Sequence, residues 1–358
     1  RAGELARALG DRSGEIPVLY GLSAFHFVRA DLTKAYEEAQ RLLELAREVG
    51  DEGYALGAKL VMGAASTHLV QFDRARHYLE SVVEGYDLRR HRGVALRLGH
   101  DPAVGAYSYL ALVMWQQGYP EQALASSEAA LELARKLDHP YSLGYATSFS
   151  AMLRQMLRQW PECETRGDMA VQLGVEGPFP SWEGIGRLIR GVALANDGRG
   201  DQGISEVAHG LAVWEATGAR LARPFQHTLL AEAHLAAGHR KEGLEAVDDA
   251  FRFSKDALWW LPEQHRVHAE LLLLEPADEG EAETVFRRAL DVARTHGNRA
   301  AELRAATGLA RLLHHQGRLT EARGLLAGAY ASFTEGFDLP DLREARELLE
   351  SLKSAPGA

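Results

Sequence analysis

A chain of 358 residues would ordinarily be expected to fold as two or three globular domains. Its 50 acidic residues outnumber its 40 basic ones, and the resulting formal charge of −10 argues against a nucleic-acid partner. The single cysteine excludes a disulfide framework. The lack of a long apolar run, a signal peptide or a lipidation motif predicts a soluble, cytoplasmic chain with no membrane partner.

A small side chain recurs about every 40 residues along nearly the whole chain, at Ala35, Ala75, Ala123, Cys163, Gly203, Gly243, Ala282 and Ala322. The spacings are 40, 48, 40, 40, 40, 39 and 40 residues. A period of this size is typical of stacked helical hairpins, each of which buries its apolar face against its neighbours. We therefore expect one elongated, curved α-solenoid in place of several globular domains.

Two further columns of residues keep the same phase. Twelve residues upstream, seven of eight side chains are small: Ser23, Gly63, Ala111, Ala151, Gly191, Ala231, Glu270 and Ala310. Small residues in these columns allow close helix crossings. Five residues upstream of the first column stand the residues of a turn column: Ala30, Val70, Gly118, Arg158, Gly198, Gly238, Ala277 and Gly317. Its four glycines suit the left-handed residue that ends a helix before a tight turn.

This pattern resembles the tetratricopeptide repeat (TPR), although the unit is longer than the usual 34 residues of that repeat. It predicts an all-α fold of about eight TPR-like hairpins in a right-handed superhelix, with about 17 helices. In chain order, we expect a remnant of a preceding repeat helix over 1–16, the eight repeats over 17–337, a capping helix over 338–352 and a tail over 353–358.

The 48-residue spacing places eight extra residues between Tyr86 and Pro102. This stretch contains Arg89, Arg90 and Arg92 and is therefore positive in an acidic chain. It is predicted to be a basic loop that meets an acidic protein surface or an anionic ligand. The alternative is a longer, solvated connection between two repeats.

The phase also predicts which residues of the first helices line the concave face of the superhelix. They combine aromatic and methionine side chains with polar ones, as a groove for a peptide or a helix would, and they are Ser108, Trp115, Gln116, Tyr145, Ser148, Met152, Gln155, Met156 and Asn196. The alternative is that several of them pack one repeat against the next.

Signatures of catalysis and of cofactor binding are missing from the sequence. It has no phosphate-binding loop, and Ser23 follows Gly21 without the closing glycine of a nucleophile elbow. His265 and His268 lack a third ligand at local spacing, so no metal or other cofactor is expected. Trp182, Trp214, Trp259 and Trp260 are predicted to wedge between repeats. We expect a non-enzymatic chain.

Four stretches resemble the C-terminal repeat region of bacterial signalling proteins that join a class III cyclase-like domain to a signal-transduction (STAND-type) ATPase. They are IPVLYGLSAFHFVRADLTKA (16–35), LGHDPAVGAYSYLALVMWQQGYPEQAL (98–124), HPYSLGYATSFSAML (139–153) and ELRAATGLARLLHHQGRLTEARGLLAGAYASFTEGFDLPDLREARELL (302–349). The resemblance implies a regulatory or sensor arm, while the cyclase and ATPase chemistry lies upstream.

Two functions are consistent with these observations. The first is a module that binds a protein or peptide partner, or the upstream ATPase and cyclase part of the same protein. The second is a receptor that holds a small molecule within the superhelix and thereby controls an ATPase switch. An open polar and aromatic strip would favour the first, and a closed pocket lined by methionine and aromatic side chains would favour the second.

Overall fold

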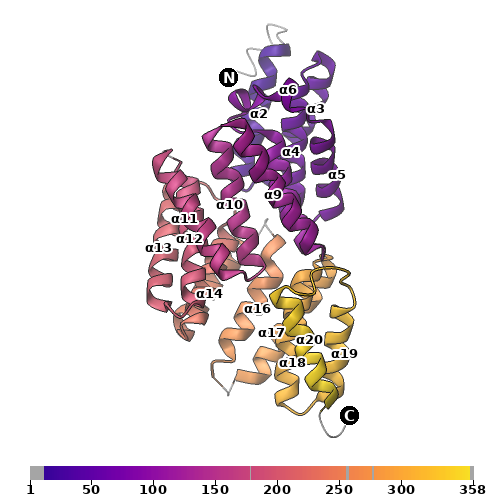
Figure 1. Ribbon diagram of the computed structural model, residues 1–358, viewed down its shortest axis with the longest axis vertical. Coiled ribbons are helices and arrows are strands. Elements are labelled where there is room, and N and C mark those ends of the chain that lie inside the picture. Colours follow the sequence, from indigo (N-terminus) through magenta and orange to yellow (C-terminus); the bar gives the residue numbers. More distant parts are fainter. Residues whose placement is uncertain (1–11, 178, 255–257, 276–277, 355–358) are drawn as a thin grey trace.

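The computed structural model describes residues 12–177, 179–254, 258–275 and 278–354 (Figure 1). These residues form 19 α-helices, one 3₁₀ helix and no strand, which confirms the predicted all-α solenoid. Sixteen of the helices form eight consecutive hairpins: α2 (Arg12–Val28) with α3 (Leu32–Val49), α4 (Glu52–His68) with α5 (Phe72–Gly85), α8 (Pro102–Gln116) with α9 (Pro120–Leu137), α10 (Pro140–Met156) with α11 (Trp160–Glu176), α12 (Pro180–Asn196) with α13 (Gly200–Ala216), α14 (Arg223–Ala236) with α15 (Arg240–Phe253), α16 (Leu261–Leu272) with α17 (Glu279–Thr295), and α18 (Arg299–His315) with α19 (Leu319–Tyr330).

The helix count differs from the prediction because the inserted stretch is itself helical. It folds into α6 (Leu88–His91) and α7 (Val94–Leu98) between α5 and α8. The Asp87 carboxylate caps the N-terminus of α6 by accepting hydrogen bonds from the backbone N–H groups of Arg89 and Arg90, at 2.8 and 2.9 Å. Val94 and Leu98 of α7 are buried against the first hairpins. The insertion is therefore a packed element of the fold.

Both ends of the described chain are helical. The first helix, α2, begins at Arg12, so residues 12–16 belong to the first hairpin, and the predicted remnant at 1–11 lies outside the described residues. The C-terminal helix α20 (Pro340–Ser354) begins two residues after the start of the predicted capping segment and ends two residues beyond it. The 3₁₀ helix η1 (Leu258–Trp260) precedes α16. Residues 355–358 of the predicted tail also lie outside the described residues.

Every residue of the first small column is buried, and the glycines show why the side chains are small. A Cβ atom on Gly203 of α13 would lie 2.5 Å from the carbonyl oxygen of Gly191 and 2.6 Å from the backbone nitrogen of Ala195, both in α12. Two helix backbones are thus in direct contact at this crossing. Such close approach fixes the angle and distance between successive helices.

The turn column adopts the left-handed conformation even where it contains no glycine. Seven of its eight residues have positive φ, including Ala30 (65°), Val70 (62°) and Arg158 (56°), while Ala277 lies outside the described residues. Left-handed backbone costs a non-glycine residue about 1–2 kcal/mol. The next residue offsets this cost by donating its N–H to a carbonyl of the last helical turn, as Gln71 donates to Ser66 at 2.9 Å.

The superhelix winds tightly enough for later hairpins to contact earlier ones. The α8 helix packs against α18, and α4 packs against η1. Figure 1 shows the last hairpins, α16 to α20, occupying the end of the molecule opposite α2 and α3. The Glu335 carboxylate accepts hydrogen bonds at the start of α9 from the backbone N–H groups of Glu121 and Gln122, at 2.8 and 3.0 Å. The Arg220 and Leu221 N–H groups both donate to the Val28 carbonyl.

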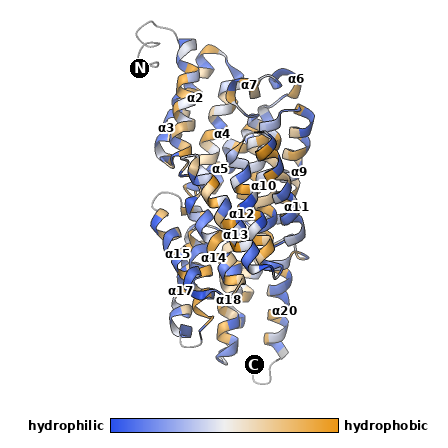
Figure 2. Ribbon diagram, turned by 90° about the vertical axis from the view of Figure 1, so that its left-hand side faces the viewer, coloured by the Kyte–Doolittle hydropathy of each residue, from blue (hydrophilic) through white to orange (hydrophobic). Residues whose placement is uncertain are grey.

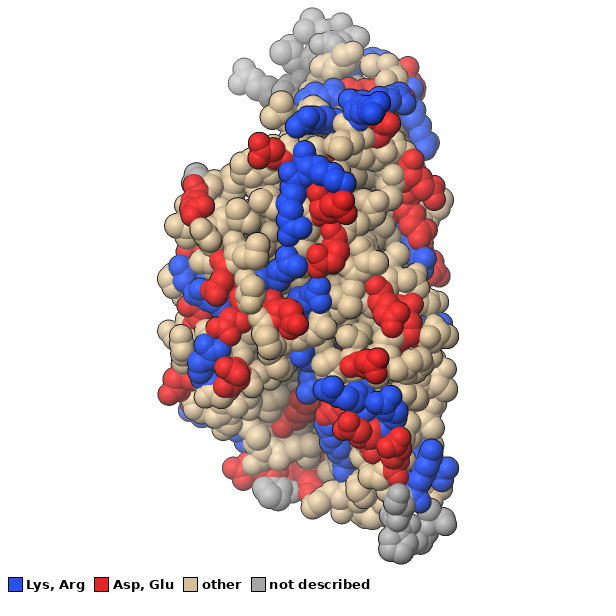
Figure 3. Space-filling view, viewed as in Figure 1, with Lys and Arg blue, Asp and Glu red and all other residues tan. Residues whose placement is uncertain are grey.

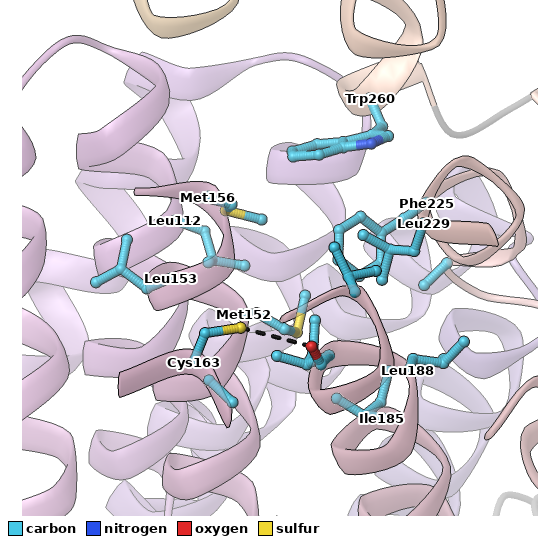
Figure 4. Packing of buried hydrophobic residues seen from close by; sticks show 14 of the residues in the cluster. Leu112, Met152, Leu153, Met156, Cys163, Ile185, Leu188, Phe225, Leu229 and Trp260 are labelled. Atoms are coloured by element: carbon cyan, nitrogen blue, oxygen red, sulfur yellow. Dashed lines mark hydrogen bonds between the residues drawn. The ribbon is translucent and has the colours of Figure 1, made fainter. Parts of the chain in front are cut away.

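The largest hydrophobic cluster joins hairpins along the chain. Hydrophilic and hydrophobic residues alternate around most helices in Figure 2, as expected where one side of a helix is buried. In Figure 4, Met152, Ile185 and Phe225 converge from α10, α12 and α14, with Trp260 of η1 above them. Cys163 is fully buried in this cluster, as predicted, and its Sγ donates to the Ile189 carbonyl at 3.5 Å.

Replacement of Gly203 by alanine tests whether the small column sets the stack. We expect Gly203→Ala to lower the free energy of unfolding by about 1–3 kcal/mol, because the backbone atoms around the new methyl group cannot rotate away. Gly324→Ala is the matched control, since a Cβ atom added to Gly324 of α19 would meet no atom within 4 Å, and this variant should gain about 0.5–1 kcal/mol. Urea denaturation of both variants measures the difference. Equal stability of Gly203→Ala and wild type would contradict the close crossing.

Candidate functional site

A cavity of about 580 Å³ lies inside the superhelix. One side of its wall comes from α2 and α4 of the first two hairpins, and the other from α8, α10 and α12. The wall is completed by residues 98–100, by Trp214, by the loop at 219–222 and by Trp259 of η1. Small-molecule sites in proteins commonly have volumes of about 300–1,000 Å³. The cavity is therefore of a suitable size for such a ligand.

Aromatic side chains dominate the wall of this cavity. Ten of its 28 residues are Phe, Tyr or Trp: Tyr20, Phe27, Tyr109, Tyr141, Tyr145, Phe149, Phe179, Trp182, Trp214 and Trp259. Three of them follow one another at a spacing of four along α10, which places them on one face of the helix. The Tyr145 ring stacks on the rings of Phe149, at 4.7 Å, and His100, at 5.3 Å.

A glycine allows this aromatic face to approach α12. A Cβ atom on Gly144 would lie 2.6 Å from Cδ1 of the Trp182 indole, so that any larger residue would displace the ring. Trp182 also contacts Tyr145, with the ring centroids 5.1 Å apart. The absence of a side chain at Gly144 and the contact with Tyr145 thus position the Trp182 indole in the cavity wall.

Among the residues that the structure describes, the cavity wall carries no Asp, Glu, Lys or Arg side chain. Its two histidines are neutral at pH 7, because burial lowers the pKa of His68 to about 3, while burial and then His139 lower the pKa of His100 to about 4. Burial likewise raises the pKa of Tyr20 and Tyr145 above the ordinary tyrosine value. The wall can provide apolar contact and neutral hydrogen-bonding groups, while nothing in it provides a formal charge.

A second pocket, of about 230 Å³, has the opposite character. Its wall holds a chain of ion pairs that crosses four helices. Arg266 contacts Glu232 at 2.7 Å and Glu263 at 2.9 Å, and Glu263 contacts Arg304 at 3.1 Å. Arg304 in turn contacts Asp341 of α20 at 2.8 Å and donates to the Met156 carbonyl. Each charge is paired, as burial requires.

This charged pocket attaches the C-terminal helix to the interior of the superhelix. Arg158, the left-handed residue after α10, pairs with Asp341 at 3.2 Å and with Glu344. Burial alone would raise the pKa of Asp341, but attraction to Arg304 and Arg158 outweighs it and lowers that pKa. For Glu232, burial prevails over the attraction of Arg266 and raises the pKa. The pairing of Asp341 thus links α20 to helices far away in the sequence.

The nine predicted groove residues fall into three places. Tyr145, Ser148 and Met152 line the aromatic cavity. Gln155 and Asn196 line the charged pocket, where the Gln155 amide donates to Glu232 at 2.9 Å. Five of the predicted residues therefore line interior spaces. These are two separate spaces, whereas the sequence predicted a single groove.

The remaining four predicted groove residues line neither of these two spaces, because packing within the superhelix covers them. Ser108, Trp115, Gln116 and Met156 are at most 2% exposed. The Gln116 amide accepts a hydrogen bond from Asn298 at 3.2 Å, and Trp115 stacks on Trp260 with the ring centroids 5.9 Å apart. These four positions match the alternative, in which repeats pack against one another.

The basic loop is less positive than its sequence suggests. Arg90 donates to both carboxylate oxygens of Glu52, at 2.8 and 2.6 Å, and Arg97 pairs with Asp51. Arg89 and Arg92 are exposed, and within the described ranges no ion pair of either is found. Figure 3 shows basic side chains gathered at the upper end of the molecule, where Figure 1 places α6. A role for this patch in binding an acidic surface remains a prediction.

Most of the cavity wall was not identified from the sequence. Tyr20, Phe27 and His68 come from the first two hairpins, whose concave residues the repeat phase would also have indicated. Trp182, Trp214 and Trp259 are buried between repeats as predicted, and they also border the cavity. The four-residue spacing of aromatic residues along α10 was the available signal for the cavity.

Two further properties bear on cofactors and membranes. Among residues 12–354, apart from the gaps given above, no group of three or more His, Cys, Asp or Glu side chains is arranged to hold a metal ion. Over the same residues, no helix is both long enough and apolar enough to cross a bilayer.

No model of a known protein family matches this chain, and no protein of curated function is significantly similar to it. Solved structures do share its fold. A Rap protein complexed with competence and sporulation factor is 11% identical, with a TM-score of 0.58 over 95% of this chain and 98% of the other. The Rap conjugation gene regulator of plasmid pLS20, in complex with the Phr* peptide, is 9% identical, with a TM-score of 0.56 over 96% and 98%.

A signal-transduction ATPase with a tetratricopeptide repeat sensor, from Pyrococcus horikoshii, is 16% identical and covers 97% of this chain and 50% of the other. Its TM-score of 0.48 is too low to support an argument about this protein. The two Rap structures establish a TPR-like helical-repeat fold. At such low identity, the similarity concerns the fold alone.

Removal of the Asp341 charge tests the attachment of α20. The pKa of Asp341 lies below its ordinary value of 3.8, so its contribution to stability is complete above that pH and is lost as the pH falls through the lowered value. We expect Asp341→Asn to lower the free energy of unfolding at pH 7 by about 1.5–3 kcal/mol. The difference from wild type should shrink as the pH falls below 3.8.

Denaturant titrations at several pH values measure this effect. Glu347→Gln, at an exposed position of the same helix, is the control and should change stability by less than about 0.5 kcal/mol. A difference between Asp341→Asn and wild type that stays constant down to about pH 2 would argue against the ion pairs as its cause.

Proposed function

We propose that this chain is a non-enzymatic regulatory module that binds a small molecule inside its superhelix. The observation that carries this proposal is the cavity of about 580 Å³ with its aromatic wall. Met152 and Tyr145 belong to that wall, and a pocket lined by such side chains is the feature that favours a small ligand over an open peptide groove. Apolar contact is what such a wall provides best.

The composition of the wall also favours a small molecule over a peptide. Each peptide residue brings a backbone N–H and a carbonyl group, and both need partners once they are buried. Apart from tyrosine hydroxyl and indole N–H groups, polar side chains in the wall come from five residues, Thr67, His68, His100, Ser148 and Ser181. The Tyr20 hydroxyl is already used, since it donates to the Leu98 carbonyl at 3.0 Å.

The position of the cavity supports a regulatory role. Its wall combines the first two hairpins with residues as distant in the sequence as Trp259. In the same region, the Val28 carbonyl accepts hydrogen bonds from the backbone N–H groups of residues 220 and 221. A ligand in the cavity contacts both parts of the superhelix at once. Binding therefore favours one relative placement of these parts, and a shift in that placement can reach an attached domain.

The wider context of the module is proposed from its sequence. The four stretches that resemble repeat regions of bacterial signalling proteins support a role as the sensor arm of an ATPase or a cyclase. A protein or peptide partner is the second candidate function, and the Rap regulator solved with the Phr* peptide supports it as an example of this fold with a bound peptide. The two candidate functions can be distinguished by the mass of the molecule that stays bound during purification, which is a small molecule in the first case and a polypeptide in the second.

Native mass spectrometry of the chain, purified gently from its source, tests the proposal. We expect a bound mass of a few hundred daltons that is lost in Ala24→Trp, because an indole at this cavity position occupies the ligand volume. Phe25→Trp is the matched control, since Phe25 is the next residue of α2, is 55% exposed and does not line the cavity. A retained polypeptide would favour the second candidate. Loss of the bound mass from both variants would contradict binding in the cavity.

A further inference from the structure

We infer that the ligand of the aromatic cavity is an uncharged molecule, mainly apolar, with few polar groups. This inference rests on the proposed function, because it names the class of ligand that the same cavity takes. The observation behind it is the composition of the wall, whose 28 described residues include no Asp, Glu, Lys or Arg. An ionised ligand would lose its water and find no opposite charge in return.

Two charged residues that follow lining residues in the sequence have partners outside the cavity. Asp101 follows the lining residue His100 but is fully buried and caps α8, where its Oδ1 accepts from the N–H groups of Ala103 and Val104. Its Oδ2 accepts from the Tyr86 hydroxyl at 2.7 Å. Arg223, which follows the lining residue Ala222, lies over the ring of Phe253. The Asp101 carboxylate is thus already hydrogen-bonded on both oxygens and does not serve as a counter-charge in the cavity.

Cations require a separate argument, because aromatic faces attract them. At Tyr145 and Phe149 of α10, ring faces that could hold a cation are covered by other rings. Tyr145 stacks between His100 and Phe149, with interplanar angles of 12° and 8°. The edge of Phe149 meets Tyr109 with the centroids 4.9 Å apart. These stacked rings present hydrocarbon and ring edges, and no carboxylate stands beside them among the described lining residues, so this part of the wall suits a neutral ligand better than an ammonium group.

Elsewhere in this protein, buried charged side chains are paired with side chains of opposite charge. In the charged pocket, Arg266 has three carboxylate neighbours, Glu232, Glu263 and Glu270, all within 2.9 Å. Arg304 likewise lies between Glu263 and Asp341. The described residues of the aromatic cavity include no such arrangement. The contrast assigns ionised groups to the charged pocket and a neutral molecule to the aromatic cavity.

A competition experiment with the full chain at pH 7 tests the inference. The fluorescent probe is N-phenyl-1-naphthylamine, which is neutral and apolar. Three competitors of similar size differ in charge: 1-naphthamide is neutral, 1-naphthoate is anionic and 1-naphthylmethylammonium is cationic. We expect the amide to displace the probe at a concentration at least about 100-fold lower than either ion, because burying an ion without a partner is strongly unfavourable.

The variants Ala24→Trp and Phe25→Trp locate the bound probe. Fluorescence that persists in Phe25→Trp and disappears in Ala24→Trp belongs to the cavity, and only this fraction is analysed. Displacement by 1-naphthoate or 1-naphthylmethylammonium within about tenfold of the amide would overturn the inference on charge and leave the cavity as the ligand site. Equal binding of the probe to wild type and Ala24→Trp, or no binding to either, would overturn both the inference and the proposed site.

Discussion

Close contact between helix backbones is the constraint from which the rest of this structure follows. Where α12 crosses α13, a single methyl group on Gly203 would overlap with backbone atoms of the partner helix. Crossings of this kind fix how successive helices pack, and the resulting step from one hairpin to the next, continued through eight hairpins, produces a superhelix. The step is small enough for later hairpins to reach earlier ones, as the contact of α8 with α18 shows.

The tight winding converts the inner face of the solenoid into two separate interior spaces. One is uncharged and aromatic, and the other contains ion pairs that extend to the C-terminal helix. Both draw on α10, whose Tyr145 and Ser148 line the first while Gln155 lines the second. A short stretch of one helix thus contributes to two environments of opposite polarity, and each environment determines which chemical groups it can hold.

The period of the sequence was sufficient to predict the hairpins, the small columns and the left-handed turns. It predicted Tyr145, Ser148 and Met152 as inward-facing because that depends on position within one repeat. It failed for Gln116, because the partner that buries this residue, Asn298, is 182 residues away and belongs to a contact between distant repeats. The division of the interior was unpredictable for the same reason. The left-handed turn was predicted from the four glycines of the turn column, and Val70, at the same phase, adopts it without being a glycine.

The cavity also has a consequence for how the protein is made. Its wall begins with Tyr20 and is complete only with Trp259, so a growing chain has no ligand site until most of its hairpins have been synthesised. A ligand present during synthesis therefore stabilises the nearly complete array and none of the shorter intermediates. If the chain binds the proposed ligand and folds hairpin by hairpin, the ligand would act as a late check on assembly, and cells that lack it would accumulate less of the folded protein.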